Sequence, residues 1–243
     1  MASNFFSKST NPILKDSLFE QNLSSTGLTM TSAGAVNKSV ILGLLLMITA
    51  VFSFAFPSTI FLLPSAIIGF VLVLIATFKK EWSPTIAPIY ALIEGLFLGS
   101  ISAYYASAFD GIVFHALSLT LAILFLMLFL YKARIIQVTE RFRSIIMIGT
   151  GAIALTYLVS FVLSFFGIQV PMIHSSGLLG IGFSLVVIVM ASLNLLLDFD
   201  FFERGEQAGL PKYMEWFAAM GLIITLVWLY LEILRLLSKF NKK

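Results

Sequence analysis

The chain has 243 residues, of which 59% are hydrophobic and only 11% charged, and its mean hydropathy is +1.02. Soluble domains carry about a quarter of their residues as charged side chains, so this chain has too little polar surface to cover a water-facing globule. The net charge of +3 is small and the basic residues fall between apolar runs, which argues against nucleic acid as a partner. The absence of cysteine excludes disulfides and thiolate metal sites.

Apolar runs of about 20 residues recur along the chain, and this is the length with which an α-helix crosses about 30 Å of hydrocarbon. The short alternating segments of a transmembrane barrel are absent from the sequence. The predicted fold class is therefore all-α, a polytopic membrane protein with seven transmembrane helices. We expect these spans at residues 39–56, 60–78, 84–106, 112–131, 144–166, 177–197 and 214–237.

Residues 1–37 precede the first expected span and are rich in Ser, Thr and Asn. A segment of this composition cannot bury enough apolar surface to fold alone. We therefore expect a flexible cytoplasmic tail at residues 1–37 and a seven-helix membrane domain at residues 38–243.

The basic residues are distributed unequally between the two sides of the expected spans. By the positive-inside rule, the side with more of them faces the cytoplasm, which predicts a cytoplasmic N-terminus and, after seven spans, a C-terminus outside. The basic residues that follow the last span are the one feature against this orientation. The cytoplasmic side carries eleven (Lys8, Lys15, Lys38, Lys79, Lys80, Lys132, Arg134, Arg141, Arg143, Arg204 and Lys212), and the other side carries four (Arg235, Lys239, Lys242 and Lys243).

Carboxylates within apolar helices are the best functional lead, because a charge in hydrocarbon is costly. Glu94 is expected about 12 Å from the cytoplasmic end of the third span, and Asp198 about 8 Å from that of the sixth. Each either binds a partner or takes up a proton, and a structural hydrogen bond is the alternative for Glu94. Asn194 shares a helix face with Asp198 and is a candidate polar group of an ion path. Asp200, a second candidate, points away from Asp198 and is expected to be solvated at the interface.

Other polar and small residues have simpler explanations. Glu232 precedes Arg235 by three residues on one helix face, which favours an ion pair within the helix. Gly95 and Gly99 form a GxxxG motif, which is typical of close helix packing, with lining of a permeation path as the alternative. No nucleophile elbow, phosphate loop or paired-cysteine pattern occurs, so we expect neither an enzyme nor a bound cofactor.

Two motifs near the C-terminus are specific enough to suggest a family. ASLNLLLDFD at the end of the sixth span and WLYLEILRLL in the seventh resemble the Bax inhibitor family of transmembrane proteins, especially its bacterial, YccA-like branch. NPIL in the tail and IYALIEGLFLG in the third span are similar to the same subgroup. The resemblance implies a bundle in which the seventh helix is surrounded by the other six. It also implies a pH-sensitive calcium leak in the bacterial inner membrane, gated by two acids that share a proton.

Carried onto this sequence, the two acids are Asp198 and Glu232, where the family usually has Asp at the second position. They would be the gating pair and transient ligands of calcium. Helix depth indicates other partners, because Glu232 lies about 31 Å from the cytoplasmic start of the last helix, and a straight hairpin would place Glu215 opposite Asp198. Three pairings therefore stay open, those of Asp198 with Glu232, with Glu215 and with Glu94.

The sequence thus predicts a pH-sensitive leak for calcium or another cation, with Asp198 as its central titratable group. The alternative is a non-conducting regulatory protein that binds another membrane protein, such as a membrane protease, through its tail and basic loops. In that alternative the acids only stabilise helix packing. A secondary transporter would show an internal repeat, and the two halves of the sequence carry no convincing one.

Overall fold

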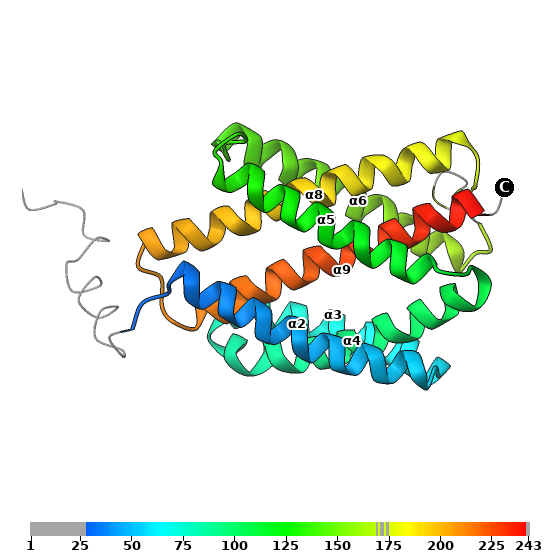
Figure 1. Ribbon diagram of the computed structural model, residues 1–243, viewed down its shortest axis with the longest axis horizontal. Coiled ribbons are helices and arrows are strands. Elements are labelled where there is room, and N and C mark those ends of the chain that lie inside the picture. Colours follow the sequence, from blue (N-terminus) through cyan, green and yellow to red (C-terminus); the bar gives the residue numbers. More distant parts are fainter. Residues whose placement is uncertain (1–27, 169, 171–172, 174, 242–243) are drawn as a thin grey trace, which may run out of the picture.

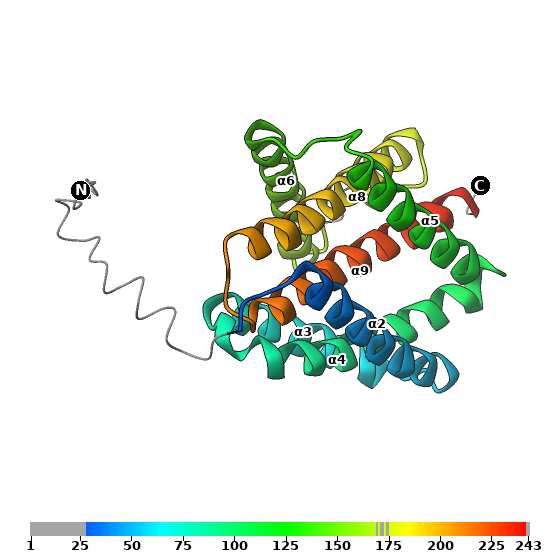
Figure 2. The ribbon, with the colours of Figure 1, turned by 60° about the vertical axis from the view of Figure 1, so that its left-hand side comes forward.

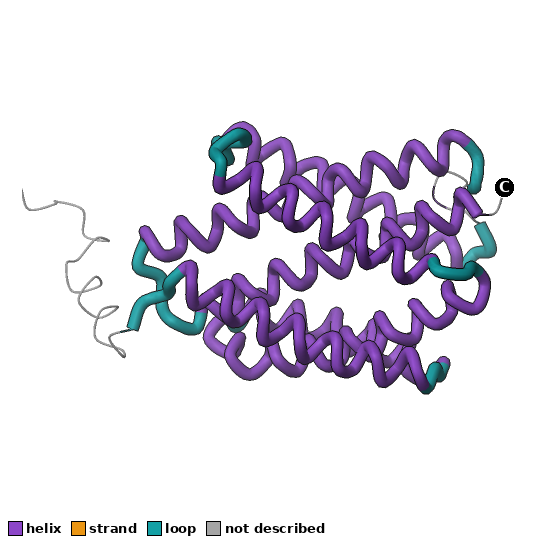
Figure 3. The backbone as a smooth tube through the Cα atoms, viewed as in Figure 1, coloured by secondary structure: helices purple, strands orange, loops and turns teal. Residues whose placement is uncertain are grey.

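The computed structural model describes residues 28–168, 170, 173 and 175–241, and within them seven long helices form one bundle (Figure 1). Six are long and apolar enough to cross a membrane, and the seventh, α3, is an apolar helix of 17 residues. The predicted all-α fold of a polytopic membrane protein is confirmed, and Figure 3 shows that helices make up most of the described chain. The helices are α2 (Ser32–Ala55), α3 (Leu62–Phe78), α4 (Ser83–Ala108), α5 (Ile112–Lys132), α6 (Glu140–Ser164), α8 (Leu178–Gln207) and α9 (Met214–Asn241), with single 3-10 turns at η1 (Thr59–Phe61) and η2 (Lys80–Trp82).

Two helices extend much further at one end than the sequence indicated. α2 begins at Ser32 rather than at residue 39, because the side chain of Thr31 accepts a hydrogen bond from the backbone N–H of Gly34 and caps the helix. The expected tail is therefore shorter, and its residues 1–27 lie outside the described part of the chain. α8 continues to Gln207 rather than ending near residue 197, so Asp198 lies well inside a helix.

The start of α2, η2, the α5–α6 connection and the α8–α9 connection all lie at the same end of the bundle, on the left in Figure 1. Thr29 forms a bridge with Pro211, the Lys80 ammonium lies 5.5 Å from the ring centre of Phe217, and Arg134 pairs with Glu203. We call this the basic end, because it collects the basic loops. The last described residues of α9 lie at the opposite end.

α9 forms the centre of the bundle. It is the most buried of the six spanning helices and packs against α2, α4, α5 and α8, and Figure 2 shows it running between them. α3 packs mainly on α4, and α6 mainly on α8. The exposed large hydrophobic side chains lie mostly on the outer faces of α2, α3, α5 and α6, as expected for surfaces that contact lipid.

The GxxxG motif of α4 brings that helix against α2. A Cβ atom added at Gly99 would lie 2.1 Å from the carbonyl oxygen of Ala50, and one at Gly95 would lie 2.0 Å from Oγ1 of Thr49. The hydroxyl of Ser53 also donates to the carbonyl of Leu96 at 2.7 Å. Lipid offers no hydrophobic drive for helix association, so this close backbone approach supplies the packing energy between α2 and α4.

We predict that Gly99→Ala destabilises the bundle, because the added methyl group meets backbone atoms of α2 that cannot rotate away. The expected loss is about 1–3 kcal/mol, the usual cost of overpacking a dense core. Thermal unfolding in detergent micelles measures it. Gly151→Ala is the matched control, because a Cβ atom there meets nothing within 4 Å. Equal melting temperatures for the two variants would contradict the prediction.

Candidate functional site

A polar cavity of about 550 Å³ lies between α6, α8 and α9. Charged residues near the basic end of α6 and α8 form its outer part, and Asp198 and Asn194 lie deeper in the bundle. On α9 it is bordered by small and aromatic residues without charge. The polar residues that line it are Arg143, Asn194, Asp198, Asp200 and Arg204. The lining residues that α9 contributes are Phe217, Ala218 and Gly221.

Asp198 is the exceptional group of this cavity. The residue is half-buried, but its Oδ2 atom is fully covered and has no hydrogen-bond partner among the described residues. A Cβ atom added at Gly221 of α9 would lie 3.8 Å from its Oδ1 atom. Thr225 also lies beside the carboxylate, although its hydroxyl donates to the carbonyl of Gly221 at 3.3 Å. The facing surface of α9 therefore offers Asp198 small and hydroxyl groups but no opposite charge.

Asp200 is not the solvated interfacial carboxylate that the sequence suggested. Its side chain is 13% exposed and pairs with Arg143 of α6 at 2.5 Å and with Arg204 of α8 at 2.9 Å. Glu140 completes the cluster by pairing with both arginines, at 3.5 and 2.9 Å. Two acids and two bases leave the cluster formally neutral, and it ties the basic end of α6 to α8.

Asn194 lines the same cavity one helical turn from Asp198. Its side-chain amide donates to Oγ1 of Thr150 on α6 at 2.7 Å and to the carbonyl of Met190 at 2.8 Å. The amide donors are thereby used to hold α6 against α8. Of the two candidate ion-path groups, Asn194 lies one turn deeper in α8 than Asp198, and Asp200 belongs to the ion-pair cluster.

The structure does not bring Glu232 to Asp198. The Oε2 atom of Glu232 accepts hydrogen bonds from the Tyr157 hydroxyl at 2.7 Å and from Arg235 at 2.5 Å, and its Oε1 atom is buried without a partner. Glu232 follows Thr225 by seven residues, which is about 10 Å along α9. The predicted ion pair within the helix is confirmed, and the pairing that the family resemblance implied is not formed.

Glu215 and Glu94 also lie away from Asp198. Glu215 accepts hydrogen bonds from the backbone N–H and the hydroxyl of Thr31, both at 3.0 Å, and pairs with Lys212 at 2.7 Å. It therefore satisfies polar groups at the start of α2, where a carboxylate is favoured. Glu94 faces α3, where a Cβ atom added at Gly69 would lie 2.9 Å from its Oε2 atom. Neither acid lines the polar cavity.

Helix lengths explain which part of α9 lies beside Asp198. α8 continues for nine residues after Asp198 (207 − 198), and α9 begins at Met214, so an antiparallel partner at equal depth falls near residue 223 (214 + 9). This level lies between Gly221 and Thr225, as observed. Glu215 was expected there because α8 was predicted to end too early.

The acids in the described part of the chain are not arranged as a preformed metal site. Among the described residues, no group of three or more His, Asp or Glu side chains is placed to hold a metal ion. Calcium takes six to eight oxygen ligands, and Asp198 and Glu232 do not act on one ion together. A cation that reaches Asp198 would therefore keep most of its water.

The sequence reasoning missed the contacts made by Tyr157 and Lys239. Lys239 is 3% exposed, and its ammonium group donates to the carbonyl of Gly180 at 2.8 Å and to the hydroxyl of Ser184 at 2.9 Å. Its spacing from Glu232 and Arg235 repeats every three to four residues, a sign of one helix face. Two of the four basic residues that argue against the predicted orientation, Arg235 and Lys239, are thus bound by other groups of the bundle. Arg235 pairs with Glu232, and Lys239 donates to oxygen atoms of α8.

These features define a class of protein: a polytopic membrane bundle with ionisable side chains inside its helices. A model of the Bax inhibitor 1 like family matches residues 11–242, nearly the whole chain. The chain therefore belongs to the Bax inhibitor 1 like family. The match is at the level of the family, and the bacterial branch stays a prediction. No curated protein matched the sequence.

We predict that Glu215→Gln lowers the stability of the protein, because it removes the charge that pairs with Lys212 and accepts two hydrogen bonds from Thr31. Hydrogen bonds to charged groups contribute about 1.5–3 kcal/mol each, so the melting temperature should fall clearly. Thermal unfolding in detergent measures it. An unchanged melting temperature would show that Glu215 does not anchor the start of α2.

Proposed function

We propose that this protein is a pH-sensitive cation leak of the bacterial inner membrane, with calcium as the first cation to test. One observation carries the proposal: a carboxylate with a covered, unpartnered oxygen lies in a polar cavity at the basic end. An ionisable group inside a membrane bundle is by default a candidate for an ion or proton path. The family resemblance supports the same function, and it supplies calcium as the cation.

The protonation state of Asp198 decides the charge at the inner part of the cavity. The other charged groups that line it are Arg143 of α6 and Asp200 and Arg204 of α8, and they are already paired with one another and with Glu140. α9 contributes no charged residue to the lining. Loss of the Asp198 proton therefore adds one uncompensated negative charge, which attracts a cation into the cavity.

The described conformation is the closed one in this proposal. The lining of the polar cavity ends at Gly221 on α9 and at Asn194 on α8, and buried apolar residues lie beyond it on both helices, including Leu222, Leu229, Ala191 and Val187. A hydrated cation does not cross such a layer, so conduction requires α8 and α9 to separate there. A charged Asp198 favours that separation, because it gains water when the layer opens.

We predict that Asp198→Asn removes the pH dependence of the leak. Proteoliposomes loaded with a calcium indicator report the flux between pH 5 and pH 8. Wild type should conduct more as the pH rises and Asp198 loses its proton, whereas the Asn variant should stay at the low-pH level. At pH 8 the flux through wild type should exceed that through the Asn variant about tenfold. This is the smallest enrichment of counter-ions expected in a cleft lined by one sign of charge.

Glu232→Gln separates this proposal from gating by an acid pair. Because Glu232 is held by Tyr157 and Arg235 away from the cavity, its variant should keep the wild-type pH dependence. Wild-type liposomes without flux at any pH, or flux indifferent to Asp198→Asn, would refute the leak. Equal loss of the pH response in Glu232→Gln would restore the pairing of the two acids.

The proposed orientation places the basic end in the cytoplasm, and the cysteine-free chain allows a direct test. Ala133→Cys lies at the basic end and Asp110→Cys between α4 and α5 at the other, and both positions are exposed. In spheroplasts, a membrane-impermeant maleimide should label Asp110→Cys at once and Ala133→Cys only after permeabilisation. The reverse pattern would overturn the orientation.

A regulatory function through another membrane protein is the second candidate. It is favoured by the placement of Leu28 and Thr29, which hold the end of the tail against the α8–α9 connection beside the polar cavity. A partner bound to the tail would lie next to the cavity mouth. Removal of residues 1–27 tests it and should abolish the association. This deletion spares Thr29 and Thr31, whereas removal of residues 1–37 would also destroy the cap of α2.

A further inference from the structure

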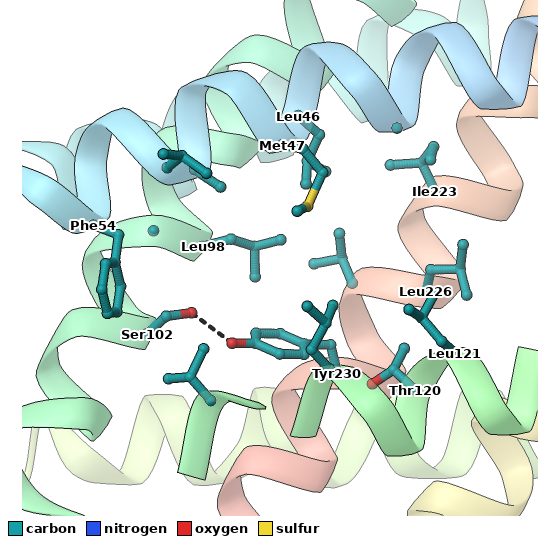
Figure 4. Close-up of a pocket in the computed structure, with 17 residues that line it drawn as sticks. Leu46, Met47, Phe54, Leu98, Ser102, Thr120, Leu121, Ile223, Leu226 and Tyr230 are labelled. Carbon is teal, nitrogen blue, oxygen red and sulfur yellow. Dashed lines mark hydrogen bonds between the residues drawn. The ribbon is translucent and has the colours of Figure 1, made fainter. Parts of the chain in front are cut away.

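A second cavity, of about 400 Å³, lies on another side of α9, between α2, α4, α5 and α9 (Figure 4). On α2 its lining runs from Gly43 to Phe54, in the second half of the helix, and on α5 from Val113 to Leu121, in the first half. Both stretches lie in the half of the bundle away from the basic end. The cavity is therefore separate from the polar one that contains Asp198.

The lining of this cavity offers no free polar group. The hydroxyls of Ser102 and Tyr230 bond to each other at 2.7 Å, as Figure 4 shows, and that of Thr120 donates to the carbonyl of Ala116 at 2.8 Å. Every other lining residue is apolar or glycine. A polar ligand would lose its water here without gaining hydrogen bonds, so the cavity accepts only an apolar one.

The cavity is continuous with the lipid-facing surface. α2 packs mainly on α4 and α9, and α5 mainly on α9 and α8, so α2 and α5 stand apart across the cavity. Several lining side chains on these two helices are well exposed, namely Met47, Val51, Phe54, Leu117 and Leu121. These residues lie within membrane-spanning helices, so the opening of the cavity faces the hydrocarbon chains of the lipids.

We propose that this cavity binds one acyl chain of a phospholipid from the leaflet opposite the basic end. The volume falls within the range of small-ligand sites, and the walls come from four helices rather than one flat face. Gly43 leaves open space on the α2 side of the cavity, since a Cβ atom added there meets nothing within 4 Å. The bound chain contacts Ile223, Leu226 and Tyr230 of the central helix, and so links the lipid to α9.

The test uses vesicles of phosphatidylethanolamine and phosphatidylglycerol that contain a phosphatidylethanolamine with a diazirine in the middle of one acyl chain. After illumination, cross-linked residues are mapped by peptide mass spectrometry. Cross-links should concentrate on residues 43–54 of α2 and 113–121 of α5, above the level on the outer face of α6. That face contacts bulk lipid and gives the background.

Gly43→Leu fills the cavity from α2, and Leu121→Trp fills it from α5. Each should lose the enrichment, whereas Gly151→Leu should retain it, because Gly151 is also open but lines neither cavity. The elution volume in size-exclusion chromatography and the melting temperature establish that the variants fold. If one of the two filling variants does not fold, the other still tests the proposal. The proposal is overturned if cross-links on α2 and α5 are no more frequent than on α6. A second copy of the protein that filled the cavity would give this same result. An enrichment unchanged in both filling variants overturns it as well.

Discussion

A charge inside hydrocarbon must be paired, and this constraint organises the interior of the bundle. Glu215 is bound by Lys212 and Thr31, Glu232 by Arg235 and Tyr157, and Lys239 by oxygen atoms of α8. These pairs lie near the two ends of α9 and hold it to α2, α6 and α8. Removal of one partner would leave the other buried and uncompensated, which costs more than the pair contributes.

Asp198 and Glu94 depart from this pattern, because neither forms an ion pair with a described residue, but only Asp198 lines the polar cavity. Asp198 is therefore the candidate functional group. It faces a part of α9 that carries Gly221 and Thr225 instead of a base, and a polar cavity reaches it from the basic end. The arginines of that cavity do not compensate it, because Asp200 and Glu140 already pair with them. The cavity is thus balanced in charge only while Asp198 carries its proton.

The central helix borders two cavities, one lined in part by charged residues and one lined almost entirely by apolar residues. Ala218 and Gly221 border the polar cavity, and Ile223, Leu226 and Tyr230 border the apolar one. The two sets lie within a few turns of each other on one helix. A displacement of α9 would therefore change both cavities together, and this connects the proposed lipid site with the proposed leak.

Local patterns in the sequence predicted the helices, the packing role of Gly95 and Gly99, and the ion pair of Glu232 with Arg235, because each depends on neighbours in the chain. The surroundings of Asp198 and the pairing of Asp200 with Arg143 depend on where α8 ends and on how α6 and α9 lie beside it. The end of α8 was misplaced because its polar last turns resemble a loop, whereas ion pairs to α6 hold them in a helix. The sequence by itself determined a membrane bundle with acids inside it. Only the tertiary structure decided which acids form ion pairs and which acid lies in the polar cavity without one, because helix length and relative depth set those distances.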